Sequence, residues 1–180
     1  MVLRFFSGIF FLVALLFSYI SWANPSERLE QLKMTHRFGI GLSGGGALAV
    51  MGIEGDVNVT ENFSISGGLG TGIDFSTVML KGRWFLMGEW VSPYLGLGIS
   101  RWWTDGTTSK DIGPSVLRNK FLSGMSDYSQ GFSVWILSPT LGVQFMHPQG
   151  FAISAEIQYL FKMLNFSNGT YAGLGVHWYF

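Results

Sequence analysis

The last ten residues read YAGLGVHWYF (residues 171–180) and alternate between two kinds of side chain. Every second residue is apolar, and the residues between them are glycine, histidine or tyrosine. A period of two is that of a β-strand, whose successive side chains point to opposite faces. The stretch therefore predicts a strand with one apolar face and one polar or small face.

The same alternation recurs through most of the chain. It predicts strands at residues 36–44, 48–58, 63–75, 77–86, 93–103, 133–146, 151–161 and 171–180. Most of these reach the length of a tilted strand that crosses a bilayer, about 9–11 residues. Lipid offers no partner to an unpaired strand edge, so such strands must close on themselves. We therefore predict an all-β fold over residues 36–180, an eight-stranded antiparallel up-and-down transmembrane β-barrel.

A soluble lipocalin-like barrel or a β-sandwich is the alternative, and it would place polar side chains on the outer face. The aromatic residues favour the membrane barrel, because they fall on the apolar phase near the strand ends, as in the two belts of such barrels. The lower belt would hold Phe38, Phe63, Trp84, Phe145, Phe151, Trp178 and Phe180. The upper belt would hold Phe75, Trp103, Trp135, Tyr159 and Phe161.

Charged and amide side chains of the predicted strands fall on the opposite phase, which faces the lumen, except for Arg101 near the outer rim. An eight-stranded barrel is just wide enough inside for its side chains to fill it. We therefore expect a closed lumen in which each buried charge is compensated, since an unpaired one would be costly. The expected lumen network comprises Arg37, Glu54, Asp56, Asp74, Lys81, Arg83, Gln144, Glu156, Gln158 and His177. For His177 we expect a hydrogen bond to Tyr179 or Arg37.

The composition agrees with a chain that is partly in contact with lipid. Charged residues make up 12% of the 180 residues, about half the share in soluble domains. Eleven basic and eleven acidic residues cancel, so no electrostatic argument favours nucleic acid as a partner. The chain has no cysteine, which excludes disulfides, thiolate metal sites and a lipoprotein anchor.

The first 23 residues have the order of a secretory signal peptide: a basic start, an apolar run and a small-residue site at Ser21-Trp-Ala23. An uncleaved transmembrane anchor is the alternative, but the apolar run at 5–20 is shorter than the roughly 20 residues that a span needs. Residues 24–35 would be a short periplasmic segment. Within it, Pro25 to Lys33 predicts a short helix, either resting on the barrel mouth or, as we favour, serving as a tether.

The terminal phenylalanine and the apolar phase before it resemble the C-terminal assembly signal of bacterial outer-membrane barrels. That signal would comprise Leu174, Val176, Trp178 and Phe180. The chain resembles the eight-stranded group that includes outer membrane proteins A, X and W. The resemblance implies a Gram-negative outer-membrane location and insertion by the barrel assembly machinery.

The upper lumen is expected to be apolar, lined by Val50, Met79, Trp102, Val134, Ile136 and Leu160. It is either a small hydrophobic core or a pocket for a small hydrophobic molecule. Pro139 lies inside a predicted strand and must remove a ladder hydrogen bond. By resemblance to barrels with strand prolines, it marks either a lateral opening or a bulge without function.

The long connection at residues 104–131 is either an interaction element or an ordinary variable surface loop. Arg101 and Lys110 are expected to contact lipopolysaccharide phosphates. The other expected partners are outer-membrane lipid and the assembly machinery, and the chain is expected to be a monomer.

An enzyme is disfavoured by the histidines, because outer-membrane barrel enzymes work at the outer leaflet or beyond. His36, His147 and His177 all fall low in the predicted barrel, away from that leaflet, and no metal-ligand spacing is present. We therefore expect no catalytic residue, metal or cofactor. The leading interpretation is a non-enzymatic surface barrel, the second is binding or transport of a small hydrophobic molecule, and the third is a lipid-modifying enzyme.

Overall fold

The computed structural model describes residues 29–86, 90–106, 121, 129–164 and 167–180. In chain order the elements are α2 (Leu29–Thr35), β1 (Phe38–Gly45), the 3-10 turn η1 (Gly46–Leu48), β2 (Met51–Thr60), β3 (Phe63–Thr71), β4 (Ser76–Phe85), β5 (Val91–Thr104), β6 (Phe132–Met146), β7 (Phe151–Lys162) and β8 (Asn168–Tyr179). None of the helices in this described part has the length and hydropathy needed to span a membrane.

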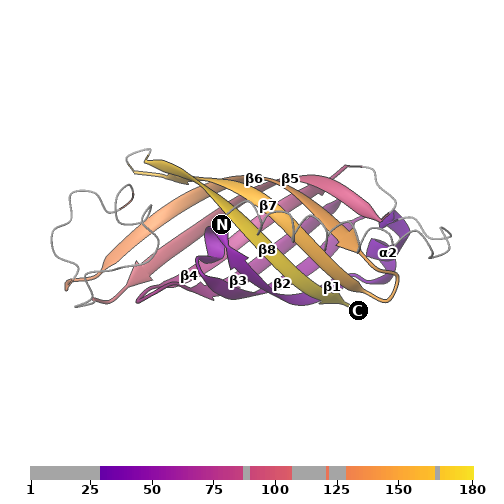
Figure 1. Cartoon of the computed structure of the whole chain (residues 1–180), viewed down its shortest axis with the longest axis horizontal. Coiled ribbons are helices and arrows are strands. Elements are labelled where there is room, and N and C mark those ends of the chain that lie inside the picture. Colours follow the sequence, from indigo (N-terminus) through magenta and orange to yellow (C-terminus); the bar gives the residue numbers. More distant parts are fainter. Residues whose placement is uncertain (1–28, 87–89, 107–120, 122–128, 165–166) are drawn as a thin grey trace, which may run out of the picture.

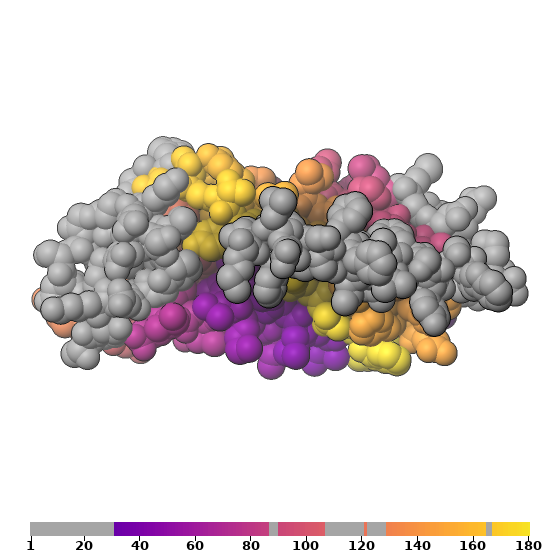
Figure 2. Space-filling view, viewed as in Figure 1, coloured from indigo at the N-terminus to yellow at the C-terminus, as the bar shows by residue number. Residues whose placement is uncertain are grey.

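The eight strands form one closed antiparallel barrel, which confirms the predicted fold class. Each strand pairs with the next, and β8 returns to pair with β1 along Gly39–Gly45. The strands run obliquely to the long axis (Figure 1), and on the outer surface the yellow of β8 lies beside the indigo of the first strands (Figure 2). Closure leaves no free strand edge, as a hydrocarbon solvent requires.

The outer face of the barrel is apolar along its whole middle. Large apolar side chains on alternate residues are more than half exposed, among them Ile40, Leu42, Ile53, Leu69, Leu80, Leu95, Leu97, Leu141, Ile157 and Leu174. Most charged residues of these strands point inward, and Glu54, Asp56, Lys81 and Arg83 are buried, whereas Arg101 near the end of β5 is exposed. This pattern is the reverse of a soluble barrel and matches a lipid-facing wall.

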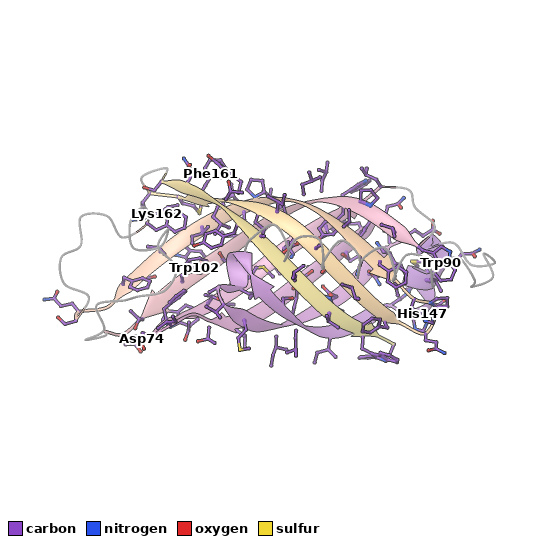
Figure 3. All side chains as sticks on the ribbon, viewed as in Figure 1. Asp74, Trp90, Trp102, His147, Phe161 and Lys162 are labelled. Atoms are coloured by element: carbon purple, nitrogen blue, oxygen red, sulfur yellow. The ribbon has the colours of Figure 1, made fainter. Side chains whose placement is uncertain are left out.

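The barrel has two different ends (Figure 1). We call the end that holds α2, the 147–150 turn and Phe180 the helix end. The opposite end, which holds residues 72–75, 105–106 and 129–131, is the loop end. Trp90 and His147 lie near α2, whereas Asp74, Phe161 and Lys162 lie at the loop end (Figure 3).

The helix end is closed by α2, so the prediction of a tether is wrong. Leu32 is 2% exposed and packs with Met146, Ala152 and Tyr179. The backbone after the helix is held as well, because Asn58 Nδ2 donates to His36 O at 2.8 Å. An amphipathic turn thus covers the apolar rim that the last strands leave open.

Arg37 does not enter the lumen, contrary to the sequence prediction. It is exposed and donates from Nε to Met34 O at 3.3 Å. The reason is that β1 begins only at Phe38, so Arg37 lies at the corner between helix and strand, where a period of two does not apply. Its guanidinium instead satisfies a carbonyl near the C-terminal end of α2.

The connection between β1 and β2 folds inward rather than continuing as a strand from residue 48. Positive φ angles at Gly45, Gly46 and Ala49 turn the chain into the barrel, and Ala47 and Leu48 become buried. Val50 then emerges on the outer side with 54% exposure. The prediction that Val50 lines the upper lumen is therefore wrong.

A second local turn reverses the expected faces of two residues at the loop end. Asp74 has a φ of 61°, and Gly72 N donates to Phe75 O at 2.8 Å. This tight turn ends β3 at Thr71 and shifts the alternation by one face. Asp74 is consequently exposed, while Phe75 is buried at 4% exposure, so their predicted lumen and belt positions are both wrong.

Candidate functional site in the barrel lumen

One strand of the barrel, β1, presents almost no side chains to the lumen, and the lumen network is built around its inward face. The inward face of β1 carries Gly39, Gly41, Ser43 and Gly45. A Cβ at Gly41 would lie 2.2 Å from the ring of His177, and one at Gly39 would lie 2.6 Å from the ring of Tyr179. Because β1 leaves this space, the side chains of its two neighbours, β2 and β8, meet directly across it.

The lower part of the network is an ion pair between β4 and β2. Arg83 bonds to Asp56 Oδ1 through Nη2, and both side chains are at most 1% exposed. Tyr179 OH donates to the second carboxylate oxygen, Asp56 Oδ2, at 2.9 Å. Gln144 Nε2 donates to the same tyrosine oxygen at 3.0 Å. Both oxygens of this buried carboxylate are therefore satisfied, which offsets part of the cost of its burial.

The upper part of the network is centred on Lys81. Its Nζ lies 3.1 Å from both oxygens of Glu156 and 3.6 Å from Glu54 Oε1. Tyr94 OH donates to Glu156 Oε2 at 2.6 Å, and Gln158 donates to Glu156 Oε1. Lys81 is thus held chiefly by Glu156, and Glu54 is its more distant acidic neighbour.

His177 lies between the two parts of the network. Its Nε2 is 3.4 Å from Asp56 Oδ2 and 3.7 Å from Glu54 Oε2. Of the two expected partners, Tyr179 makes a ring contact with centroids 6.1 Å apart, and Arg37 is outside the lumen. Neither ring nitrogen has a hydrogen-bond partner among the residues that the structure describes.

Eight of the ten residues named for the lumen network are thus gathered in the lumen, and Arg37 and Asp74 are not. Sequence reasoning missed Ser43 and Ser64, which bond to Glu54 and Arg83. It also missed Lys33, whose position next to Leu32 on a short helix was the only available signal.

Lys33 is the charged group of α2 that enters the lumen. Its Nζ lies over the ring of Phe85, and the side chain is nearly fully buried. Burial, and next the Arg83 guanidinium, lower the pKa of Lys33 from 10.5 to about 6, and Asp56 opposes them by less. An aromatic face favours the ammonium by only about 2 kcal/mol, less than removal of an unpaired charge from water costs.

The loop end of the lumen is filled by an apolar cluster. Trp102, Val134, Ile136 and Leu160 pack there together with Ala49, Phe75, Phe121 and Phe132. The Trp102 ring contacts Phe75 and Phe121 at centroid distances of 5.3 and 6.1 Å, and its Nε1 donates to Ala47 O at 2.8 Å. Met79 belongs to a neighbouring cluster with Ala47 and Leu48. Phe121 comes from the predicted surface loop, so part of that loop reaches into the barrel.

Pro139 interrupts the ladder between β6 and β7. Pairing on this side passes from Leu137↔Phe161 directly to Thr140↔Gln158, whereas on the other side Pro139 pairs with Leu97 of β5. The missing N–H of proline accounts for the gap. The gap lies beside Leu160, a member of the apolar cluster.

Arg101 and the terminal strand have the exposure that their predicted roles require. Arg101 is exposed, its guanidinium lies 5.7 and 5.9 Å from the rings of Trp103 and Trp135, and its Nε donates to Ser133 Oγ. Lys110 lies outside the described residues. Three residues of β8 point outward, Leu174, Val176 and Trp178, and so does the C-terminal Phe180.

A closed barrel with an apolar outer wall and an ion-paired interior defines an integral outer-membrane β-barrel protein. The chain belongs to the family described as outer membrane protein beta-barrel domain, which matches residues 12–180. No curated protein matches the sequence.

Solved structures with a similar chain path include the N-terminal β-barrel domain of OprF from Pseudomonas aeruginosa. It has 15% sequence identity and a TM-score of 0.58, over 81% of this chain and 98% of that one. Two structures of the outer membrane protein Ail from Yersinia pestis also match at 15% identity. Their TM-scores are 0.43 and 0.37, over 81% and 80% of this chain and 99% and 97% of theirs. At this identity the OprF domain supports the fold.

Proposed function

We propose that this protein is a non-enzymatic outer-membrane barrel with a closed lumen, which anchors the loop at residues 104–131 at the cell surface. The observation that supports closure is the filling of the lumen along its length. Leu32 and Lys33 occupy the helix end, the ion pairs of Arg83 and Lys81 occupy the middle, and the Trp102 cluster occupies the loop end. A solute would have to displace buried, mutually bonded charges to pass.

The histidines support a non-enzymatic role. His36 and His147 lie at the helix end, where His36 Nε2 contacts Pro148 O at 3.0 Å. His177 is 2% exposed inside the barrel. Acid–base chemistry on outer-leaflet lipid needs a histidine or similar group within reach of that lipid, and these three lie elsewhere.

The proposal includes export and assembly. Residues 1–23 are removed as a signal peptide, residues 24–35 form the periplasmic segment that ends in α2, and the assembly machinery reads the outward residues of β8. Arg101 binds lipopolysaccharide phosphate, supported by its exposed position between two tryptophans, and Lys110 assists it. The barrel is a monomer whose outer wall contacts lipid.

Planar-bilayer recording of the purified protein tests the closed lumen. We expect no steady conductance from the wild-type chain, and openings only when Arg83→Ala removes the ion pair. The control variant Arg101→Ala, at an exposed residue, should show no conductance. A steady ion current through wild-type protein would overturn the closed-lumen proposal.

Deleting residues 107–128 tests the role of the loop. We expect the barrel to fold and the binding of cells to a partner surface to be lost. Unchanged surface binding by cells that carry the shortened protein would reject the loop as the interaction element.

Binding of a small hydrophobic molecule is the second candidate, favoured by the ladder gap at Pro139 beside the apolar cluster. Native mass spectrometry of the barrel extracted from membranes would then show a stoichiometric adduct that Trp102→Ala abolishes. A bare protein mass in gentle extraction would exclude this candidate.

A further inference from the structure

Within the described ranges, the buried side chain of His177 lacks the hydrogen bonds that a buried imidazole normally makes. Both ring nitrogens are buried and lack a hydrogen-bond partner in the part of the chain that the structure describes. Glu54 Oε1 also lacks a hydrogen bond there, although Lys81 Nζ lies 3.6 Å from it. Buried polar atoms are almost always satisfied, and those that are not commonly mark a bound ion or water. An ion or a water bound at the cluster would satisfy these atoms.

The chemistry of the cluster is that of a metal site. We propose that Glu54, Asp56 and His177 bind one divalent transition-metal ion of the zinc class inside the barrel. One ligand atom from each of these residues can be chosen so that all three lie within 4.8 Å of one another. An imidazole with two carboxylates is a ligand set suited to zinc and its neighbours in the first transition series.

The distances fit an ion between the three side chains. Nε2 of His177 lies 3.4 Å from Asp56 Oδ2 and 3.7 Å from Glu54 Oε2. Ligands that lie about 2.0–2.2 Å from a tetrahedral ion are about 3.3–3.6 Å from each other. The two pairs that involve His177 are therefore close to their coordinated separation, and the two carboxylates, whose ligand oxygens lie within 4.8 Å of each other, would have to approach each other further.

The strand between the ligands is shaped to make room for the imidazole. Gly41 of β1 lies opposite His177 on one side and Glu54 on the other. A Cβ at Gly41 would lie 2.2 Å from His177 Cδ2, and a Cβ at Gly175 would lie 2.7 Å from His177 Cε1. Two inward glycines thus leave the space that the ring occupies.

Neighbouring hydrogen bonds orient the carboxylates. Ser43 Oγ donates to Glu54 Oε2 at 2.6 Å, and Tyr179 OH donates to Asp56 Oδ2 at 2.9 Å. Such outer partners fix metal-ligating carboxylates in place.

Charge also favours a bound cation. The described strands bring three carboxylates into the lumen, Glu54, Asp56 and Glu156, and two cations, Lys81 and Arg83. Lys81 is held by both oxygens of Glu156, and Arg83 by Asp56 Oδ1. Glu54 has the more distant cation, Lys81 Nζ at 3.6 Å, and an ion between Glu54 and His177 would link β2 to β8 across β1.

Zinc uptake by the full chain, purified from outer membranes in detergent and stripped with a chelator, tests the site. After dialysis against Zn²⁺ alone, elemental analysis should give one zinc per barrel. His177→Gln and Glu54→Gln should weaken zinc binding at least tenfold, while the control His147→Gln, a histidine in a turn, should retain it. In the wild type, Co²⁺ should produce visible absorption bands that His177→Gln removes.

Two glycine variants distinguish a specific loss of metal coordination from general damage to the barrel. Gly41→Ala should abolish zinc binding by displacing the imidazole. Gly55→Ala should not, because a Cβ at Gly55 meets no heavy atom closer than 3.9 Å. Circular dichroism identifies which variants fold. Absence of stoichiometric zinc in folded wild type, equal uptake by folded His177→Gln, or loss of uptake only in His147→Gln would each overturn the proposal.

Discussion

The Arg83–Asp56 ion pair offers a quantitative test of how the lumen is stabilised. Asp56→Asn removes one charge but keeps an acceptor for Tyr179, and Arg83→Met removes the other charge but keeps the aliphatic stem. Each variant leaves its former partner charged and buried, because the two side chains are 0% and 1% exposed. The two single variants and the double variant together form a double-mutant cycle.

The expected magnitudes follow from burial. Removing one partner of a buried pair costs about 3–5 kcal/mol, whereas replacing both is far less costly. Each single variant should therefore lower the free energy of unfolding by about 3–5 kcal/mol. The double variant should lose less stability than either single variant, which corresponds to a coupling energy of at least about 3 kcal/mol.

Urea-induced unfolding in lipid vesicles, followed by tryptophan fluorescence, measures these differences. Arg101→Met serves as the control, because its guanidinium is exposed and bonds only to Ser133 Oγ in the described structure. It should change stability by no more than about 0.5 kcal/mol. Single-variant losses below 1 kcal/mol, or strictly additive losses in the double variant, would refute the reasoning.

Three further predictions concern the two ends of the barrel and the ladder gap. The pKa of Lys33 is 10.5 in the unfolded chain and about 6 in the folded barrel, so between these pH values the unfolded chain binds more protons. The free energy of unfolding should therefore rise with pH across that interval, by up to about 1.4 kcal/mol per pH unit. Unfolding measured from pH 6.5 to 9 should show this slope in wild type and not in Lys33→Met; equal slopes would contradict it. Trp102→Ala should destabilise the barrel by about 3–5 kcal/mol, more than Trp135→Ala on the lipid face, as thermal unfolding would show. Pro139→Val should restore a ladder hydrogen bond and add about 0.5–1.5 kcal/mol, and a lower melting temperature would argue that the proline is required by the fold.

The fold could be predicted because a barrel wall obeys one rule over most of its length. Each residue in β5 or β8 faces either lipid or lumen, so alternation alone assigns its side. The rule fails where the backbone leaves the extended conformation. Ala49 and Asp74 adopt positive φ angles, and each such residue changes the face of the residues beside it, which is why Val50 and Phe75 were misplaced.

The sequence predicts most of the residues that line the lumen, but it predicts less well which of them bond to one another. The lumen phase identified Asp56 and Arg83 as inward charges, but which acid meets which base depends on the register between strands. For His177, the sequence predicts Tyr179 or Arg37 as the partner, whereas Nε2 lies nearest to carboxylate oxygens of Asp56 and Glu54. That arrangement depends on the empty face of β1, and glycines in a strand do not by themselves reveal which side chains will fill the space above them.

The glycine face of β1 also has a consequence for the order of folding. The contacts that cross it join residues near opposite ends of the barrel sequence, such as Asp56 with Tyr179, and contacts so distant in sequence are slow to form. Until β8 reaches β1, the carboxylates of β2 have no partner from β8. Pairing of the last strand with the first and completion of the interior network are thus expected to occur together, and a chain that stalls before this step has an open strand edge and an Asp56 without its hydrogen bond from Tyr179.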